Sequence, residues 1–94
     1  MIEIEGGKVR RDGQVIGYVE EEYVRDHNYE KIGYVSDGYV KDMEGKKLSY
    51  IEGEYLYSYD SRSAHTELDK INEAVKGDAV PEIMRCAVYQ LIGA

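Results

Sequence analysis

A short pattern of apolar and polar positions recurs over the first two thirds of the chain, at a step of about 16 residues. One half of each copy is Val followed by one or two basic residues and Asp, and the other half is an aliphatic residue, a small residue, Tyr and an aliphatic residue. Each copy is too short for a strand-helix-strand unit but fits two strands and two tight turns, which predicts an antiparallel β-meander of hairpins built by duplication, over residues 2 to about 59. The copies are residues 9–12 with 16–19, residues 24–26 with 32–35, residues 40–42 with 48–51, and a weaker fourth that begins at Tyr55.

The turn between two copies fixes how the strands pair. Asp37-Gly38 suits a two-residue loop in which both central residues have positive φ, so Val35 is expected opposite Val40 and Tyr34 opposite Lys41. The same offset gives the other hairpins, in which a Gly53-Glu54 loop pairs Ile51 with Leu56 and Tyr50 with Tyr57, and a Glu21-Glu22 loop pairs Val19 with Val24 and Tyr18 with Arg25. Each hairpin then has an aliphatic pair on one face and a tyrosine with its partner on the other.

Within each copy the turns differ. Asp12-Gly13 suits a two-residue turn, whereas Met43-Glu44-Gly45 suits a three-residue loop with Gly45 in the left-handed conformation. Because a shift of one residue exchanges the two faces of a strand, the sequence leaves open whether all the aliphatic pairs share one side. The acids that precede these turns are expected to hydrogen-bond backbone amides in the turns rather than to bind calcium. They are Asp12, Asp26 and Asp42.

Gly17 and Gly33 interrupt strands, where glycine normally weakens a sheet. Their recurrence predicts a close approach by a neighbouring aromatic ring or backbone, and the alternative is a groove left open for a ligand. Ser49, also small, occupies the third equivalent position.

After Asp60 the apolar spacing becomes helical. Ser61 or Ser63 is expected to cap a helix that buries Leu68, Ile71 and Val75 and ends at Gly77. A second helix is expected from Pro81 through Ile92, with a strand over Val88 to Ile92 as the alternative. The prediction is an α+β, mainly β, single domain of residues 1–94, with six to eight strands in residues 1–60 and helices in residues 61–94.

Composition narrows the possible partners. The chain has ten Tyr but no Phe and no Trp, so its core is expected to be thin. Because each Tyr hydroxyl needs water or a partner, part of the sheet surface is expected to stay in contact with solvent. A formal net charge of −7 opposes binding to nucleic acid or to anionic lipid. No stretch approaches the roughly 20 apolar residues of a membrane helix, and Met1 to Glu5 lacks the features of a signal peptide. We expect no membrane insertion and a cytoplasmic location.

The sequence offers little for catalysis. Cys86 lies on the apolar stripe of the second predicted helix and is expected to be a small buried side chain. His27 and His65 lie far apart with no local partner, so neither a catalytic triad nor a metal motif is predicted. Glu52 and Glu54 flank a turn without a cleft, and Gly6-Gly7 lacks the rest of a phosphate loop. We expect no enzyme activity, no metal and no cofactor.

The recurring tyrosines are the strongest candidate for a functional surface. The predicted registers place them on equivalent strand positions, with two basic side chains close enough to lie over their rings. The candidate interaction face is Tyr18, Tyr34, Tyr50 and Tyr57 with Arg25 and Lys41. Such a surface is typical of protein interfaces and of sugar-binding platforms, and the alternative is that the rings only cover the sheet or receive the helices.

The pattern Gly-x-Val-x-x-x-Gly-x-x-Ile-Gly-x-Val over residues 7–19, with relatives at 22–35 and 38–51, resembles bacterial domains of unknown function built from tandem glycine-punctuated hairpins. In those domains a short hydrophobic tail with alanine often follows the repeats, and residues 86–93 look similar. The chain departs from the pattern at Ser49 and over residues 60–80. The resemblance implies a hairpin-repeat fold and carries over no catalytic residue.

These observations favour a non-enzymatic structural or protein-interaction module that forms homo-oligomers. An open sheet with two edges and two partly apolar faces needs more cover than a short helical segment provides. The alternative is a platform for a carbohydrate or small ligand on the tyrosine surface.

Overall fold

The structure, a computed structural model, describes residues 1–77 and 79–93. Its first eight strands form a continuous antiparallel meander in which each strand pairs with the next, as the repeat predicts. They are β1 (Ile2–Glu5), β2 (Lys8–Arg11), β3 (Gln14–Glu20), β4 (Tyr23–Asp26), β5 (Lys31–Ser36), β6 (Tyr39–Lys41), β7 (Lys47–Glu52) and β8 (Tyr55–Ser58). The mainly β fold class is confirmed, and two further strands extend the sheet to ten.

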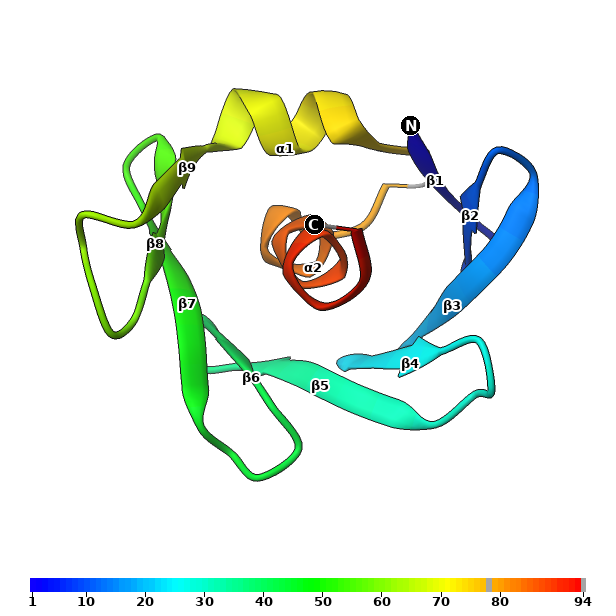
Figure 1. The fold of residues 1–94 in the computed structure, drawn as a ribbon, viewed down its shortest axis with the longest axis horizontal. Helices are drawn as coiled ribbons and strands as arrows, with labels where there is room; N and C mark the ends of the chain where they lie inside the picture. Colours follow the sequence, from blue (N-terminus) through cyan, green and yellow to red (C-terminus); the bar gives the residue numbers. More distant parts are fainter. Residues whose placement is uncertain (78, 94) are drawn as a thin grey trace.

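The two additional strands lie at the edges of the sheet. β9 (His65–Glu67) pairs antiparallel with β8, and β10 (Val75–Gly77) pairs parallel with β1. Helix α1 (Leu68–Ala74) joins β9 directly to β10 and spans the gap between the two ends of the curled sheet (Figure 1). Both edges are therefore only three residues long, which limits edge-to-edge pairing with another chain.

The C-terminal helical segment lies inside the curl of the sheet. It consists of α2 (Glu82–Val88) and one π-helical turn, η1 (Tyr89–Gly93), and the strands surround it (Figure 1). A helix with a broad apolar stripe must be buried on most sides, and the curled sheet provides this. The main core combines inner-face strand residues with the helix: Ile2, Ile4, Val9, Val24, Val40, Val75, Met84, Ala87 and Val88.

The predicted registers of all three hairpins are confirmed. Val35 lies opposite Val40, Val19 opposite Val24, and Ile51 opposite Leu56. The tyrosine pairings are confirmed with them: Tyr34 with Lys41, Tyr18 with Arg25, and Tyr50 with Tyr57. The predicted turn glycines Gly13, Gly38, Gly45 and Gly53 have φ values of 82°, 81°, 86° and 63°.

A bulge in each copy puts every aliphatic pair on the same side. The ladder shifts register beside Val9, Val24 and Val40, which leaves one extra residue in the facing strand. The extra residues are Ile16, Ile32 and Leu48, and all three pack against the main core. Because bulges also increase twist and bend the strand, three equally spaced bulges curl the sheet around the helix.

The acids before the three-residue loops organise those loops. The Asp26 carboxylate accepts hydrogen bonds from the backbone amides of Asn28 and Glu30 at 2.9 and 3.0 Å. Asp42 accepts from Glu44 and Lys46, both at 2.9 Å. Asp12 lies in the two-residue turn with a positive φ of 52°.

Gly17 and Gly33 lie where the C-terminal turn presses on the sheet. A Cβ on Gly17 would lie 2.5 Å from Ile92 Cδ1 and 2.6 Å from the carbonyl oxygen of Arg25. A Cβ on Gly33 would lie 2.5 Å from Leu91 Cδ1 and 2.8 Å from the carbonyl oxygen of Lys41. The close approach is made by aliphatic side chains of the helical turn and by neighbouring backbone, rather than by an aromatic ring.

Two predictions and one alternative for the C-terminal third are wrong. Ser61 and Ser63 do not cap a helix, because α1 begins at Leu68 with Glu67 as its N-cap; the two serine hydroxyls bond each other at 2.8 Å before β9. Gly77 does not end α1; it belongs to β10, where its bare Cα faces the backbone of Ile4. The alternative of a strand over residues 88–92 is also wrong, because these residues are helical. The second helix, with Pro81 at its start, is confirmed.

Gly33→Ala tests the close approach. The added methyl group would clash with the Leu91 side chain and with the Lys41 backbone. We therefore expect a loss of about 2 kcal/mol in the free energy of unfolding, measured in urea. Ser49→Ala is the matched control, because that equivalent position already carries a Cβ and loses only a hydrogen bond, worth about 1 kcal/mol. Equal losses in the two variants would contradict the steric explanation.

Candidate functional site

The outer face of the sheet carries the recurring tyrosines. Residues opposite one another across a ladder share a face, so the confirmed registers place these rings on the side away from α2. We call this surface the tyrosine face; it consists of Tyr18, Tyr23, Tyr34, Tyr39, Tyr50, Tyr55 and Tyr57, all of them half-buried. It includes the four tyrosines predicted from sequence and three more, at positions 23, 39 and 55, that repeat at the same step.

The rings contact each other rather than standing alone. Tyr39 lies edge-on to both Tyr50 and Tyr59, with centroids 6.0 and 5.8 Å apart. Tyr50 stacks on Tyr57 at 5.8 Å, and Tyr57 contacts Tyr55 at 6.0 Å. These contacts join the rings of β6, β7 and β8 into one aromatic cluster, which fixes their positions.

Basic side chains lie over rings of the tyrosine face, but they are not the predicted Arg25 and Lys41. Lys31 Nζ lies 4.0 Å from the centroid of Tyr23, and Lys47 Nζ lies 4.4 Å from that of Tyr39. Arg25 covers Tyr29 at 4.2 Å, not Tyr18, and Lys41 lies 3.9 Å from Asp37. The sequence did contain a signal for Lys31 and Lys47, since each directly precedes the bulge residue of its copy.

Arg62 closes one end of the tyrosine face. Its guanidinium lies 4.2 Å from the centroid of Tyr57, donates to the Tyr50 hydroxyl at 2.6 Å, and forms a paired hydrogen bond to Glu52 at 3.0 and 3.2 Å. Hydrogen bonding and charge attraction from Arg62 lower the pKa of Glu52, and the same pair raises the pKa of Arg62. At the other end, the hydrogen bond that Tyr29 donates to Glu20 raises the pKa of Tyr29.

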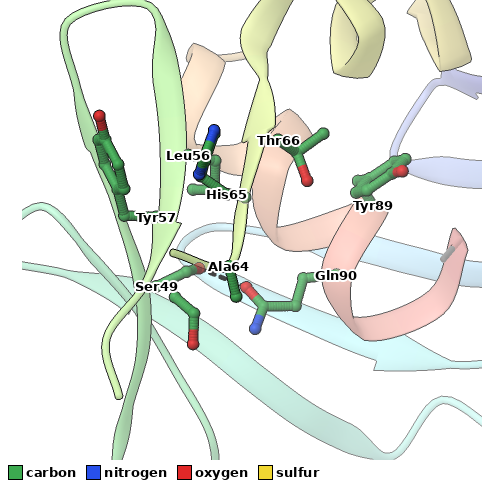
Figure 2. Close-up of a pocket in the computed structure, with 9 residues that line it drawn as sticks. Ser49, Leu56, Tyr57, Ala64, His65, Thr66, Tyr89 and Gln90 are labelled. Atoms are coloured by element: carbon green, nitrogen blue, oxygen red, sulfur yellow. Dashed lines mark hydrogen bonds between the residues drawn. The ribbon is translucent and has the colours of Figure 1, made fainter. Parts of the chain in front are cut away.

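A hollow of about 330 Å³ lies between the end of the sheet and the C-terminal turn. Its walls come from β7, β8, β9 and η1, with Ala64 just before β9, and most of its lining is shown in Figure 2. The lining residues are Ser49, Leu56, Tyr57, Ser58, Ala64, His65, Thr66, Tyr89 and Gln90. We call it the Ser49 pocket. The sequence pointed to it only through the loss of the repeat glycine at Ser49.

The two histidines and the cysteine lie in unrelated places. His27 is in the turn after β4 and lines a small hollow with residues 14–16, whereas His65 is on β9 and packs against Tyr55 at 5.0 Å. Cys86 is buried, and burial raises the pKa of its thiol to about 12, with a smaller contribution from Glu82. Within residues 1–77 and 79–93 no group of three possible metal ligands comes together, and no helix is long and apolar enough to cross a membrane.

Removing the Arg62 partner should change the titration of Glu52. Because the ionised carboxylate is the form that Arg62 binds, any stability this pair adds is present above the unfolded-state pKa of Glu52 and is lost as the pH falls through the lower folded-state pKa. We expect the Glu52 midpoint, followed by carboxyl-carbon NMR, to lie below its ordinary value and to rise in Arg62→Gln. Lys70→Gln removes one positive charge on α1 and should leave the midpoint in place; an unchanged midpoint in Arg62→Gln would contradict the assignment.

The Cys86 thiol should not react while the protein is folded. Only the thiolate attacks a disulfide reagent, and a buried thiol with a pKa near 12 supplies almost none at pH 8. We expect no reaction with Ellman's reagent in native buffer and complete reaction in guanidinium. Native-state labelling at the rate of a free thiol would show that α2 leaves the sheet readily.

No protein-family model, curated protein or solved structure matches the chain. The resemblance to bacterial hairpin-repeat domains therefore stays a prediction. The tyrosine face and the Ser49 pocket have to be interpreted from their own geometry.

Proposed function

We propose that this protein is a non-catalytic module that associates with further copies of itself through the tyrosine face. The observation that carries the proposal is the aromatic cluster with its basic side chains, held on adjacent strands of a sheet that is packed on its other side. Tyrosine and arginine are enriched at protein interfaces, where preordered rings lose little conformational entropy on binding.

The exposed charges of the face indicate what it contacts. Among the described residues, no carboxylate pairs with Lys31 or Lys47, whose ammonium groups rest on the rings of Tyr23 and Tyr39. Two cations on an aromatic surface suit a partner that presents carboxylates.

A second copy of this chain presents such groups. The hairpin turns carry exposed acids, among them Glu21, Glu22, Asp37, Glu44 and Glu54. The acidic turns of one copy can therefore meet the basic side chains of the tyrosine face of another, a contact between unlike surfaces. The inner face is filled by α2 and the sheet edges are short, so the outer face is the surface that can accept this contact.

The absence of catalysis is supported by how the reactive groups are distributed. His27 lies in the turn after β4 and His65 on β9, and they line different hollows, so the two histidines do not share a site. Cys86 is buried with a raised pKa.

A carbohydrate platform on the same face has less support. Sugar rings stack on the exposed flat faces of aromatic side chains. Here Lys31, Lys47 and Arg62 lie over several of those faces, and Tyr39 meets its neighbours edge-on.

Reversing the charge of the two unpaired lysines tests self-association. We expect sedimentation velocity of the wild-type protein to show a mass that rises with concentration between about 10 µM and about 1 mM, the range of a weak interface. Lys31→Glu with Lys47→Glu should remove this rise, because the substituted side chains repel the acidic turns of the second copy.

The matched control is Lys70→Glu with Lys76→Glu, which makes the same charge change on α1 and β10. We expect it to associate like the wild type, with circular dichroism showing that both double variants are folded. A wild-type protein that stays monomeric over the whole range, or equal weakening in both double variants, would refute the proposal.

A further inference from the structure

At the Ser49 pocket, the C-terminal helical turn leaves space between itself and the inner face of the sheet. In the first two copies, Ile92 covers Gly17 and Leu91 covers Gly33, so aliphatic side chains occupy the space left by each glycine. At the third equivalent position the sheet offers Ser49 and the turn offers Gln90, and these two side chains form a hydrogen bond. The close aliphatic contact of the first two copies is replaced here by a hollow whose lining combines hydroxyl and amide groups with apolar surface (Figure 2).

The hollow at Ser49 lowers the packing energy of the core, which suggests that it has a function. Ser49 is the buried polar residue of the described core, only 2% exposed. A protein with no Phe or Trp has few apolar groups to spare, and a hollow at the edge of a thin core loses contact energy unless something occupies it. A hollow of this size with hydrogen-bonding groups on part of its wall holds either water or a ligand.

Several neutral donors and acceptors in the pocket lining have side-chain groups available for hydrogen bonds to a ligand. The hydroxyls of Ser58, Thr66 and Tyr89 have no side-chain hydrogen bond to any described residue. Gln90 uses its amide oxygen for Ser49, which leaves its amide nitrogen free to donate. Figure 2 shows the oxygen of Gln90 turned toward Ser49 and the nitrogen turned away from it.

The charges of the lining exclude other ligand classes. No Asp, Glu, Lys or Arg lines the pocket, and its one imidazole, His65, packs against the rings of Tyr55 and Tyr57, so a strongly charged molecule would find no permanent counter-charge there. A purely apolar molecule would leave the hydroxyls and the amide unpaired. A molecule whose own hydroxyls can both donate and accept satisfies the wall, while Leu56 and the ring of Tyr89 offer apolar surface for its carbon atoms.

We infer that the Ser49 pocket binds a small neutral polyhydroxy molecule, of the class of a monosaccharide or a cyclic polyol. The volume of about 330 Å³ is at the small end of ligand sites, which suits one sugar ring and not a chain of them. The bound molecule sits against Thr66 and Gln90, apart from Lys31 and Lys47, which do not line the pocket.

Titration followed by amide NMR tests this inference on the intact protein. The probes are glucose, galactose, N-acetylglucosamine and myo-inositol, with glucuronate as a charged comparison and benzyl alcohol as an apolar one. We expect at least one neutral probe to cause saturable shifts at residues 49, 56–58, 64–66 and 89–90, with a dissociation constant in the millimolar range, and both comparisons to bind more weakly.

Two variants link the binding to the pocket. Thr66→Val keeps the shape and removes one hydroxyl, so the dissociation constant should rise about five- to tenfold. Ser49→Gly with Gln90→Leu copies the Gly33 and Leu91 pair of the second copy; it should stay folded, melt at a higher temperature because the hollow is filled, and lose the binding altogether. Lys31→Ala, on the outer face, should bind like the wild type.

The inference is overturned if no neutral probe gives saturable shifts, or if the shifts appear on the outer face around Tyr23 and Tyr39 instead of in the pocket. It is also overturned if both pocket variants are folded and bind as tightly as the wild-type protein. Should the Ser49 and Gln90 double variant fail to fold, the Thr66→Val titration decides the matter.

Discussion

The close contact between the C-terminal helical turn and the inner face of the sheet determines the rest of the structure. Ile92 and Leu91 approach the strands so closely that only glycine fits beneath them, at positions 17 and 33. The same contact explains the repeated bulges, because a flat meander would touch α2 along one line, whereas a curled one surrounds it. Helix α1 then needs to cover only the remaining gap, which it does by packing Leu68 and Ile71 against Cys86 and Leu56.

Once the aliphatic residues are used inside, the outer face must be made of side chains that tolerate both water and a sheet. Tyrosine meets this requirement, since its ring covers the strand while its hydroxyl stays wet. The side chains of Lys31, Lys47 and Arg62 then pack on these rings, with their charged groups over the ring faces. A protein whose formal net charge is −7 thus acquires an aromatic surface with basic side chains on it, while the hairpin turns carry exposed acids such as Glu21, Glu22, Asp37, Glu44 and Glu54.

Much of the sheet could be predicted from sequence because its information is local. Two-residue turns at Asp12-Gly13 and Asp37-Gly38, and period-two alternation on either side of them, fix both the pairing and the register. The bulges could not be predicted, since they depend on how much curvature the helix demands. The prediction for residues 61–77 was wrong for a related reason. Apolar positions 68, 71 and 75 fit one long helix, but α1 ends at Ala74. Val75 instead forms a parallel strand beside β1, a partner that lies far away in the sequence. The tyrosines of the candidate site were visible in the repeat, whereas the Ser49 pocket arises from a helix turn and a strand that meet only in the folded chain.

The order of elements along the chain affects how such a protein is made. The meander emerges from the ribosome before α2, so its inner valines and isoleucines have no covering helix until residues 82–93 are synthesised. The final contact is also long-range, as the hydrogen bond from Arg11 to the carbonyl of Gly93 joins residues 82 positions apart. A nascent chain in this state exposes a hydrophobic sheet surface of the kind that chaperones recognise, until residues 82–93 dock inside the curl of the sheet.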